Sequence, residues 1–302
     1  GEKIRLVRTM TDNEEGKFVA DTIQEQKLRN HYYNKDFAIL YRTNAQSRAF
    51  EESLRRMGIP YIIYGGISFY QRKEIKDYIA YLRIIVNPRD EEALKRIINY
   101  PARGIGKISV DKAILAANEN NISFWEVLTR AKEFGYKGGT LESIENFVLM
   151  IKSFASMLEK QNAYDLAVHV GKQTSFVKEL FNDKSTEGVA RYENIQELLN
   201  SIKEWIESPD NEDGELVDKS LGSYLQQITL LTDADAKDPN ADCVKLMTIH
   251  AAKGLEFSVV FAAGLEEMLF PNALAINTRE ELEEERRLFY VVITRAKQKL
   301  WV

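Results

Sequence analysis

Residues 37–64 read FAILYRTNAQSRAFEESLRRMGIPYIIY, and they indicate the fold more clearly than any other part of the chain. The opening FAILY is a short apolar run of the kind found in a buried strand. Phe50, Leu54 and Met57 then recur at helical spacing, and Gly58 follows the end of the predicted helix. The closing YIIY is a second apolar run. A strand, a helix and a strand in so short a segment predict a βαβ unit and therefore a parallel sheet.

A second helix is predicted after the Gly65-Gly66 break. Its apolar residues share one face and are Ile75, Tyr78, Ile79, Leu82 and Val86. This helix should end before Pro88, because proline does not continue a helix. We therefore expect the first part of the α/β region to end near residue 88.

Strand character returns near the C-terminus. Apolar runs cover 244–249 and 259–263, a helix rich in Glu and Arg is predicted over about 280–297, and 300–302 resembles the start of another strand. Between 89 and 240 the apolar spacing is helical almost throughout, with one polar loop, SPDNEDG. The sequence therefore predicts an α/β domain built from two discontinuous segments, with an all-helical domain inserted between them.

Composition limits the class of protein. The chain has 302 residues, of which 44% are hydrophobic and 29% charged, so it can form sizeable cores under a well-solvated surface. Cys243 is the only cysteine, which excludes an intramolecular disulfide and makes a reducing compartment the default. The three histidines are dispersed and give no zinc-binding pattern. No apolar stretch reaches the roughly 18 residues of a membrane span.

Charge is distributed unevenly along the chain. The net charge is −5, but residues 1–112 hold 21 basic and 15 acidic residues, whereas the remainder holds 20 and 31. The balance is therefore +6 in the first part and −11 in the second. A basic first third fits contacts with phosphates, and a random fluctuation of surface charge fits equally well.

The two ends of the sequence also carry information. The N-terminal Gly-Glu-Lys lacks an initiator Met and begins no signal peptide, and the final Leu-Trp-Val stops inside an apolar run. We expect both ends to have been cut from a longer chain.

Residues 248–257 read TIHAAKGLEF and lie between two predicted strands. Loops at the carboxyl ends of parallel strands are where α/β sheets bind ligands. This segment concentrates a hydroxyl, an imidazole, an ammonium, a glycine and a carboxylate, and the carboxylate can accept hydrogen bonds from a ribose. The alternative is an ordinary connection whose polar groups cap a helix or face water.

Residues 283–296 read EEERRLFYVVITRA. Arg295 follows an apolar run that should be buried, and an arginine at the edge of a core needs an anionic partner. A nucleotide phosphate would serve, in which case Arg295 would stabilise charge on a transferring phosphoryl group. The alternative is a salt bridge to the Glu cluster of the same segment, whose other charges then form a solvated helix face.

Two further segments are weaker candidates for phosphate contacts. Residues 41–48, YRTNAQSR, lie at a strand-to-helix turn, where Thr43 or Asn44 is a suitable N-cap and a helix N-terminus can hold a phosphate. Residues 101–107, PARGIGK, place Gly-x-Gly at the start of a helix beside two basic side chains. Plain helix capping and a tight inter-helix turn are the respective alternatives.

Two motifs of nucleotide hydrolysis are absent from the sequence. No Gly-x-x-x-x-Gly-Lys-Ser/Thr occurs to grip the β- and γ-phosphates, and no apolar strand ends in Asp-Glu to hold a phosphate-bound magnesium. No nucleophile and base lie at the spacing of a hydrolase motif. We therefore expect that this chain does not hydrolyse ATP alone.

Taken together, these segments resemble the UvrD/PcrA/Rep group of superfamily 1 DNA helicases. TIHAAKGLEF resembles motif V of that group, and YVVITRA at 290–296 resembles motif VI. Further matching segments are YRTNAQSR, GGISFYQRKEIKD, RGIG and LLTDAD, the last at 230–235. They occur in the order and spacing of the family over essentially the whole chain.

The resemblance implies an α/β RecA-like fold in two domains. Residues 1–88 and 241–302 would form the motor domain 2A, incomplete at its C-terminus, and 89–240 the inserted helical domain 2B. The Walker motifs of the family would lie in a preceding half, and motif IV just upstream of residue 1.

The resemblance also assigns roles to single residues. Glu256, with Gly254 in the same loop, would contact the ribose of ATP, and Arg295 would be the catalytic arginine finger. Residues expected on DNA are Arg42, Thr43 and Asn44 on the single-strand track, Thr248 and His250 beside it, and Arg103, Gly104, Ile105, Gly106 and Lys107 on duplex backbone. Val292 stands where the family has a small residue, so we expect slight crowding at the motif VI turn.

The function implied is that of the C-terminal part of an ATP-dependent 3′–5′ DNA helicase of repair or replication. ATP and Mg²⁺ would be required, with the magnesium ligands outside this chain and no metal site within it. Expected partners are single-stranded and duplex DNA, the N-terminal half of the helicase, and repair or replication proteins, with no membrane. We expect a cytoplasmic bacterial protein associated with the nucleoid.

Two other interpretations remain open. The chain, and its helical domain above all, fits a sequence-neutral DNA- or protein-binding regulatory module. It also fits part of a helicase–nuclease of the AddA/RecB type, which a nuclease domain beyond Val302 would distinguish.

Overall fold

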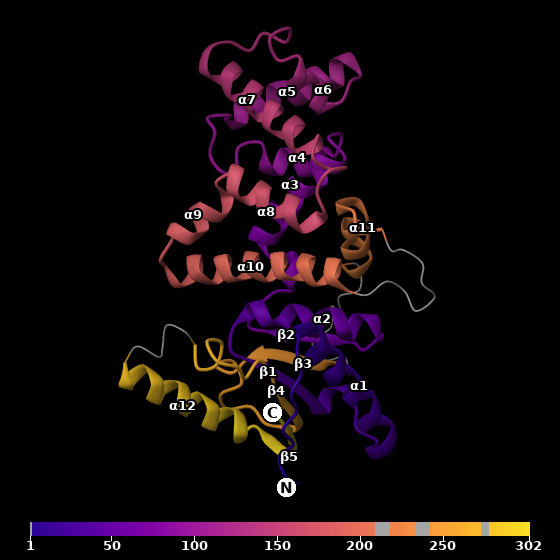
Figure 1. Ribbon diagram of the computed structural model, residues 1–302, viewed down its shortest axis with the longest axis vertical. Coiled ribbons are helices and arrows are strands. Elements are labelled where there is room, and N and C mark those ends of the chain that lie inside the picture. The colour runs from indigo at the N-terminus through magenta and orange to yellow at the C-terminus, as the bar shows by residue number, and fades with distance from the viewer. Residues whose placement is uncertain (1, 209–217, 233–241, 273–277) are drawn as a thin grey trace. The chain divides into compact units, whose positions relative to one another are not determined.

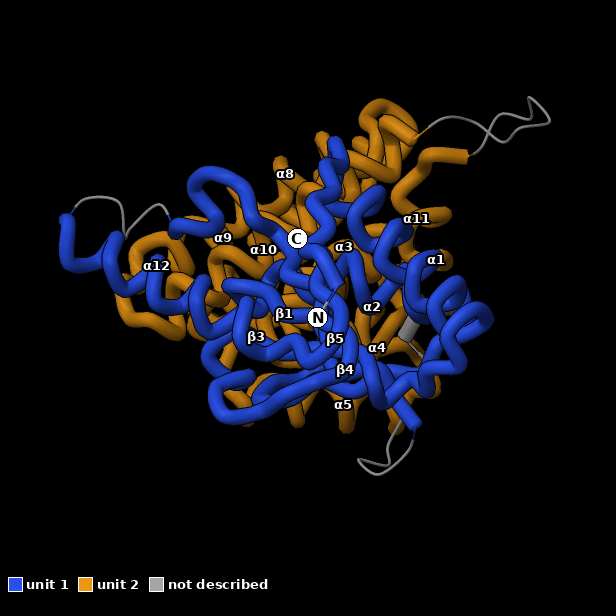
Figure 2. The backbone as a smooth tube through the Cα atoms, turned by 90° about the horizontal axis from the view of Figure 1, so that it is seen from below, with its two compact units in different colours: residues 1–72, 230–302 blue, residues 73–229 orange. Residues whose placement is uncertain are grey.

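The computed structural model describes residues 2–208, 218–232, 242–272 and 278–302. The chain forms two compact units (Figure 2). Unit 1 comprises residues 1–72 and 230–302, and unit 2 comprises 73–229. The LLTDAD and SPDNEDG segments lie largely outside the described residues.

Unit 1 is built on a parallel five-stranded sheet in the order β2-β3-β1-β4-β5 (Figure 1). The strands are β1 (Phe37–Tyr41), β2 (Tyr61–Tyr64), β3 (Val244–Thr248), β4 (Phe257–Ala262) and β5 (Ala296–Trp301). Every pairing between them is parallel, so the parallel sheet predicted from residues 37–64 is confirmed. The second segment of unit 1 contributes β3 and β4, which lie on either side of β1. Strand β3 therefore lies between β1 and β2, the two strands of the βαβ unit.

Helices cover both faces of this sheet because side chains of each strand alternate between two apolar cores. Phe37, Ile39 and Tyr41 of β1 pack in one core with α1 (Asp12–Asn30) and α2 (Ser47–Arg56). Ala38 and Leu40 pack in the other with α12 (Arg279–Ile293). Unit 1 is thus a three-layer α/β/α structure in which β1 is buried on both faces. Three short 3-10 helices complete it, namely η1 (Asn34–Asp36), η2 (Asn44–Gln46) and η3 (Phe69–Gln71).

The N-terminal segment extends the sheet beyond β5. The Arg5 N–H donates to the Leu300 carbonyl at 3.0 Å, and the Val7 N–H donates to Val302 at 2.8 Å. The Val302 N–H donates back to Arg5 at 2.8 Å, so the pairing is parallel and reciprocal.

Helix α1 was missed by the sequence interpretation, which recognised no element before residue 37. A usable signal was present in Thr11, whose hydroxyl accepts the Glu14 N–H at 3.2 Å and caps the helix. The buried face of α1 includes Gly16, Thr22 and Gln26, so its apolar periodicity is weak.

The helix predicted over 280–297 was wrong at its C-terminal end. Helix α12 stops at Ile293, and β5 already begins at Ala296. The Thr294 hydroxyl bonds back to the carbonyls of Tyr290 and Val291 at 3.1 and 2.8 Å, which satisfies the last helical turn and lets the chain leave it.

In the part of unit 2 that the structure describes, every regular element is a helix, as the sequence predicts. The helices are α3 (Lys73–Val86), α4 (Glu91–Ile97), α5 (Lys107–Asn120), α6 (Phe124–Thr129), α7 (Gly138–Ala155), α8 (Ala163–Gln173), α9 (Phe176–Asn182), α10 (Thr186–Glu207) and α11 (Leu221–Thr232), the last of which reaches into unit 1.

The units divide at residues 72/73 and 229/230, whereas the sequence placed the domain boundaries at 88 and 241. The difference lies mainly in α3, which packs against α4, α7, α8 and α10 of unit 2. Its Tyr78 hydroxyl donates to the Ala167 carbonyl at 2.7 Å, and its Glu74 accepts from the Asn194 amide at 2.5 Å. Helix α3 therefore belongs to the helical core, although its apolar stripe alone cannot reveal which partner covers it.

Candidate functional site

The polar residues singled out from the sequence lie at the two opposite ends of the parallel strands in unit 1. Thr248 ends β3, whereas Glu256 immediately precedes β4. Because β3 and β4 are both parallel to β1, residues 249–256 must carry the chain back along the strands. The expectation that the whole TIHAAKGLEF loop lies at the carboxyl ends was therefore wrong. A strand of this length separates the two ends by roughly 20 Å.

We call Leu255, Glu256, Thr294 and Arg295 the amino-end surface, because they precede β4 and β5. The Arg295 guanidinium donates to the Leu255 carbonyl at 2.8 Å, the Val291 carbonyl at 3.1 Å and the Thr294 hydroxyl at 2.9 Å. These neutral acceptors fix the direction of the side chain without neutralising its charge.

Among the described residues, Arg295 makes no ion pair with a carboxylate. The Glu cluster offered as its alternative partner pairs with other arginines, Glu285 with Arg42 and the other two within α12. Glu283 pairs with Arg286 at 2.8 Å, and Glu284 pairs with Arg287 at 3.1 Å. Both arginines are at least three-quarters exposed, so this is the solvated helix face that the sequence suggested. The salt-bridge interpretation of Arg295 was wrong.

Glu256 is open to solvent beside Arg295. Its side chain is 57% exposed, and its nearest cation is Lys297 at 3.7 Å. The Phe257 N–H donates to the Arg295 carbonyl at 2.9 Å, which ties the loop before β4 to the turn before β5. Gly254 has a φ of +88° with open space where a Cβ would lie. The amino-end surface thus presents one anchored cation and one accessible carboxylate.

We call Arg42, Thr43, Asn44, Thr248, His250 and Glu285 the carboxyl-end surface. Here the arginine is neutralised, because Arg42 forms a two-pronged ion pair with Glu285 of α12, Nη2 to Oε1 at 2.8 Å and Nε to Oε1 at 3.0 Å. The Arg42 side chain is 21% exposed and that of Glu285 only 6%. Glu285 also accepts the Asn272 N–H at 3.1 Å.

The other members of the carboxyl-end surface are less engaged in contacts within the protein. Asn44 and His250 are exposed, and Thr43 is half-buried. The Thr248 hydroxyl accepts the Ala251 N–H at 3.3 Å and so closes the turn that follows β3, rather than capping a helix. Although the His250 residue is exposed overall, desolvation of its ring, and next the nearby Arg42 guanidinium, hold the pKa of His250 below its ordinary value, which favours the neutral imidazole.

Gln46 organises the start of this surface and was not singled out from the sequence. Its Oε1 accepts the N–H groups of Arg42 and Thr43, both at 2.9 Å. Gly264, at a φ of +66°, leaves room for the Gln46 amide, which a Cβ there would overlap. Only the fold brings these two residues together, since neither lies in a recognisable motif with the other.

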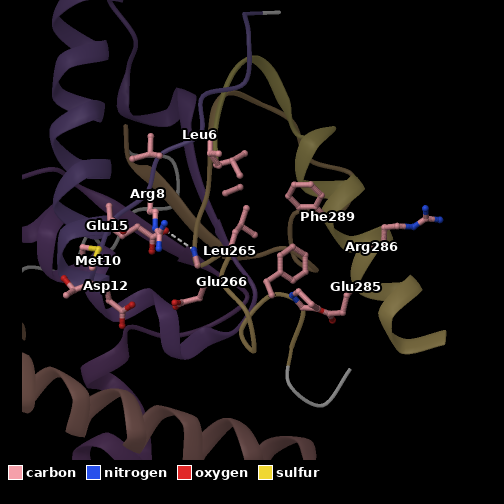
Figure 3. Close-up of a pocket in the computed structure, with 18 of the residues that line it drawn as sticks. Leu6, Arg8, Met10, Asp12, Glu15, Leu265, Glu266, Glu285, Arg286 and Phe289 are labelled. Atoms are coloured by element: carbon pink, nitrogen blue, oxygen red, sulfur yellow. Dashed lines mark hydrogen bonds between the residues drawn. The ribbon is translucent and has the colours of Figure 1, made fainter. Parts of the chain in front are cut away.

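A pocket of about 970 Å³ opens at the carboxyl ends of β4 and β5 (Figure 3). It lies between the N-terminal segment, the loop after β4 and α12, and its lining is mainly apolar and acidic, with five carboxylates against two basic side chains, Arg8 and Arg286. Glu15 lines it and accepts the Gly264 N–H at 2.9 Å, and burial raises the pKa of this carboxyl. Neither Glu256 nor Arg295 belongs to the lining. A polyanionic nucleotide does not fit such a lining, so the pocket is no candidate for the ATP site.

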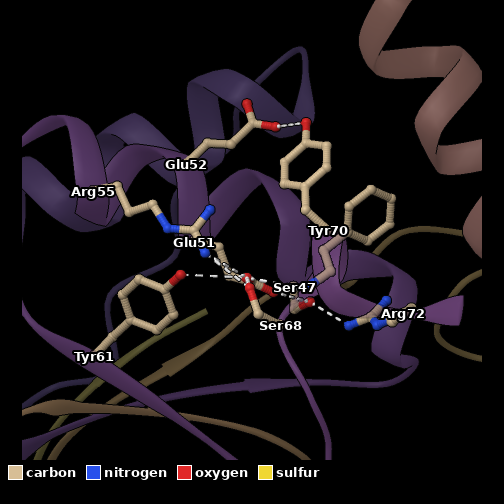
Figure 4. Close-up of polar contacts among 9 residues, drawn as sticks. Ser47, Glu51, Glu52, Arg55, Tyr61, Ser68, Tyr70 and Arg72 are labelled. Carbon is tan, nitrogen blue, oxygen red and sulfur yellow. Dashed lines mark hydrogen bonds and ion pairs between the residues drawn. The ribbon is translucent and has the colours of Figure 1, made fainter. Parts of the chain in front are cut away.

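The last two residues of YRTNAQSR use their polar groups within unit 1, and Figure 4 shows Ser47 among these contacts. The Ser47 hydroxyl donates to Glu51 at 2.7 Å and accepts from Arg72 at 2.8 Å. Arg48 is 1% exposed and pairs with Glu52 at 3.3 Å. The interpretation of this helix start as a phosphate site was therefore wrong for Ser47 and Arg48.

Glu51 is the centre of this buried cluster. Its carboxylate accepts from the Ser68 hydroxyl at 2.5 Å and the Phe69 N–H at 3.0 Å, and it lies 3.5 Å from Arg55. Burial raises its pKa, and the serine hydrogen bonds and Arg72 oppose that shift. The cluster fixes the segment from Ser68 to Arg72, where the chain leaves unit 1.

In unit 2, the Gly-Ile-Gly turn lies directly before α5, as predicted. Arg103 is half-buried, and its guanidinium donates to the carbonyls of Ile97 and Pro101 at 3.2 and 2.9 Å and also bonds the Tyr81 hydroxyl. The Ile105 side chain is 1% exposed. Gly104, Gly106 and Lys107 are exposed. Arg103 and Ile105 thus form the support of the turn rather than its surface.

Three further observations concern metal binding, membrane spans and the position of Val292. Within the described parts of the chain, no three His, Cys, Asp or Glu side chains are placed together so as to hold a metal ion. No helix there combines the length and the apolar character needed to cross a membrane. Val292, expected to crowd the motif VI turn, is fully buried in the core beneath α12.

The parallel sheet, its two helical layers and the paired loops before β4 and β5 define an α/β RecA-like domain, here with a helical unit between its two segments. The chain belongs to the family of UvrD-like helicase C-terminal domains, which it matches over residues 1–302. The resemblance noted from the motifs is thereby confirmed.

The chain is similar over its whole length to three bacterial proteins named ATP-dependent DNA helicase PcrA. It is 39% identical to the protein of Bacillus subtilis, 40% to that of Staphylococcus aureus and 38% to that of Staphylococcus epidermidis. In each case the match covers 100% of this chain and 41% of the relative. The chain therefore spans about two fifths of the length of these relatives.

Proposed function

We propose that this chain is the C-terminal part of an ATP-dependent DNA helicase that moves 3′ to 5′ on single-stranded DNA and separates duplexes. The observation that carries the proposal is Arg295, a guanidinium held by three neutral acceptors and in no ion pair with a carboxylate among the described residues. Anchoring a cation in this way is useful where an anion arrives from outside, as in phosphoryl transfer.

The amino-end surface would form one side of the ATP site. Arg295 would stabilise charge on the transferring phosphoryl group, and Glu256, with Gly254 giving the loop its turn, would accept hydrogen bonds from the ribose. ATP supplies the reaction's free energy, and Mg²⁺ bound with it neutralises phosphate charge. The phosphate loop and the magnesium ligands would come from the N-terminal half of the helicase, so this chain alone should be inactive.

The carboxyl-end surface would carry the single strand. Arg42, Thr43 and Asn44 follow β1, and Thr248 and His250 follow β3, so all five lie at neighbouring strand ends. Exposed amide and hydroxyl groups there suit sugar and phosphate contacts that do not depend on base sequence. A neutral His250 would act as a hydrogen-bonding or stacking group rather than as a cation.

In this proposal unit 1 corresponds to the motor domain 2A of the family, and unit 2 corresponds to its helical domain 2B. Unit 2 would then make the contacts with duplex DNA. Backbone N–H groups at Gly104 and Gly106 and the Lys107 ammonium can approach a phosphate from the start of α5. Arg103 and Ile105 would support this turn from within. The chain would thus bind both single-stranded and duplex DNA, in the bacterial cytoplasm and at the nucleoid.

The test is Arg295→Ala in the intact protein, with Arg286→Ala as a matched control. We expect ATP hydrolysis in the presence of single-stranded DNA to fall roughly 1000-fold or more, because the finger's charge is lost. DNA binding should change little, since Arg295 lies at the other end of the strands. Arg286 is 78% exposed on α12, the helix that ends just before Arg295, and its loss should leave turnover intact. Near-normal hydrolysis by Arg295→Ala would rule out the proposed role.

A further inference from the structure

Glu285 is the most deeply buried carboxylate of α12, and the proposed function gives it no role. Its side chain is 6% exposed, yet it carries a cationic partner, Arg42, whose Nη2 and Nε lie at 2.8 and 3.0 Å from Oε1. Its second oxygen, Oε2, accepts the Asn272 N–H at 3.1 Å and approaches the Arg42 Nε at 3.2 Å. Both carboxylate oxygens are therefore engaged, and the orientation of the pair is fixed.

Helix α12 joins this pair to the amino-end surface. Glu285 and Arg295 are ten residues apart, which corresponds to about 15 Å along a helix. Between them Leu288 and Val292 are buried in the core beneath the helix, so α12 rests on the sheet along this length. A displacement of the helix at Glu285 is consequently felt at Arg295, because packed helices move as bodies.

Arg42 is the other half of the connection. It directly follows β1, and its own backbone N–H is held by Gln46, so only its side chain can move without disturbing the sheet. Two anions can bind this guanidinium, namely the Glu285 carboxylate and a phosphate of single-stranded DNA bound on the carboxyl-end surface. A phosphate that draws Arg42 weakens its bond to Glu285, because the fork of the guanidinium cannot serve both fully.

We propose that Glu285 is a positioning residue that links the single-strand track to the arginine finger through the Arg42–Glu285 pair and the body of α12. The proposal rests on the proposed function and deepens it. While the pair is closed, it holds α12 in place and keeps the charge of Arg42 neutralised. When a strand phosphate engages Arg42, the start of α12 is released, and Arg295 at its far end adjusts toward the nucleotide.

This linking role distinguishes the Arg42–Glu285 pair from an ordinary buried salt bridge. A purely structural pair would affect stability alone. A linking pair affects the ratio of ATP hydrolysis with DNA to hydrolysis without it, and it also affects how strongly salt weakens DNA binding. The second effect follows because freeing Arg42 adds one cation to the phosphate-binding surface.

The experiment uses Glu285→Gln in the intact protein, with an oligothymidylate as the single strand. Glutamine keeps the size of the side chain and one acceptor for Arg42 but removes the charge. We expect the stimulation of kcat by DNA to fall about tenfold or more, while the DNA concentration for half-maximal stimulation does not rise. The slope of log Kd against log salt should steepen by roughly one phosphate contact.

The matched control is Glu284→Gln, one residue away on the same helix. Its carboxylate is 60% exposed and pairs with Arg287, so its removal should leave the stimulation and the salt slope unchanged. In the double variant Arg42→Gln/Glu285→Gln, the loss of stimulation should not exceed that of the larger single loss, because the two residues act as one unit.

Stimulation within about twofold of wild type in a folded Glu285→Gln protein would overturn the proposal. Should that variant unfold below the assay temperature, Arg42→Lys decides, since lysine keeps the charge but not the two-pronged geometry. Lost stimulation then supports the link, and full stimulation overturns it. A wild-type protein with no DNA-stimulated hydrolysis would instead overturn the proposed function.

Discussion

The arginines at the two ends of the parallel strands in unit 1 have different kinds of hydrogen-bond partner. At the carboxyl ends Arg42 is neutralised by Glu285 at 2.8 Å, and both side chains are largely withdrawn from water. At the amino ends Arg295 is held by two carbonyls and a hydroxyl. The comparison shows that this sheet compensates the charge of one arginine with a carboxylate at one end and holds the other with neutral acceptors alone at the opposite end.

The difference has a simple energetic basis. Carbonyl and hydroxyl acceptors orient a guanidinium without cancelling its field, whereas a buried carboxylate cancels it at the cost of desolvating both partners. Charges at the carboxyl ends should therefore matter for folding, and charges at the amino ends for chemistry. Variants at the two ends test that division, beginning with the largest effect on stability.

Loss of the Glu51 carboxylate should destabilise the fold more than the removal of any exposed carboxylate. We expect Glu51→Ala to lower the free energy of unfolding by about 3–5 kcal/mol, because it leaves Arg55 and the Ser68–Phe69 turn without their buried acceptor. The measurement is denaturant unfolding followed by circular dichroism.

The matched variant from the amino-end surface is Glu256→Ala. Its side chain is 57% exposed, so we expect a change within about 0.5 kcal/mol. Equal losses in the two variants would show that compensated, buried carboxylates do not contribute more to stability than exposed ones in this unit.

A methyl group at Gly264 should also destabilise unit 1, because Gly264 lies next to Gln46 at the carboxyl ends of the strands. Gly264→Ala places a Cβ on the Gln46 amide and strains a φ of +66°, so we expect a loss of about 1–3 kcal/mol. Gly254→Ala carries the strain alone, because nothing lies within 4 Å of its Cβ position. Thermal unfolding of both variants isolates the contribution of Gln46, and a smaller loss at Gly264 than at Gly254 would contradict its role.

The smallest expected effect concerns pH. Burial raises the pKa of Glu15 above the ordinary 4.5, so the folded state holds this proton more tightly than the unfolded state does. Its contribution therefore favours folding at low pH and turns unfavourable as pH rises from about 4.5 through the raised pKa. We expect Glu15→Gln to raise the unfolding temperature at pH 7 and to leave it unchanged near pH 4. A gain of equal size at both pH values would point to packing instead of charge.

The sheet and most of its helices could be predicted because their signals are local. FAILY, YIIY and the run over 244–249 are apolar segments of strand length, and each forms a strand, the last one ending at Thr248. Gly58 follows α2 with a φ of +64°, as its position after the apolar stripe predicts. Helix α1 escaped because its buried face includes glycine and polar residues, so apolar periodicity did not mark it.

The site could be predicted only in part, because its geometry depends on contacts that are distant in sequence. Arg295 and Glu256 were found through motifs, but their position at the amino ends follows from the path of residues 249–256. The Arg42–Glu285 pair joins residues 243 positions apart, and nothing local marks either as the other's partner. Arg103 was assigned to DNA, whereas its guanidinium is bonded inside unit 2.

The pairing of the N-terminal segment with β5 has a consequence for the behaviour of the molecule in concentrated solution. A strand with unpaired N–H and C=O groups invites pairing with another chain, and long apolar strands of this kind favour aggregation. Arg5 and Val7 cover β5, the strand that carries Leu300 and Trp301. The opposite margin is β2, only four residues long, which offers little template. We therefore expect that removal of residues 2–7, which exposes the hydrogen-bonding edge of β5, increases self-association of the chain at high concentration.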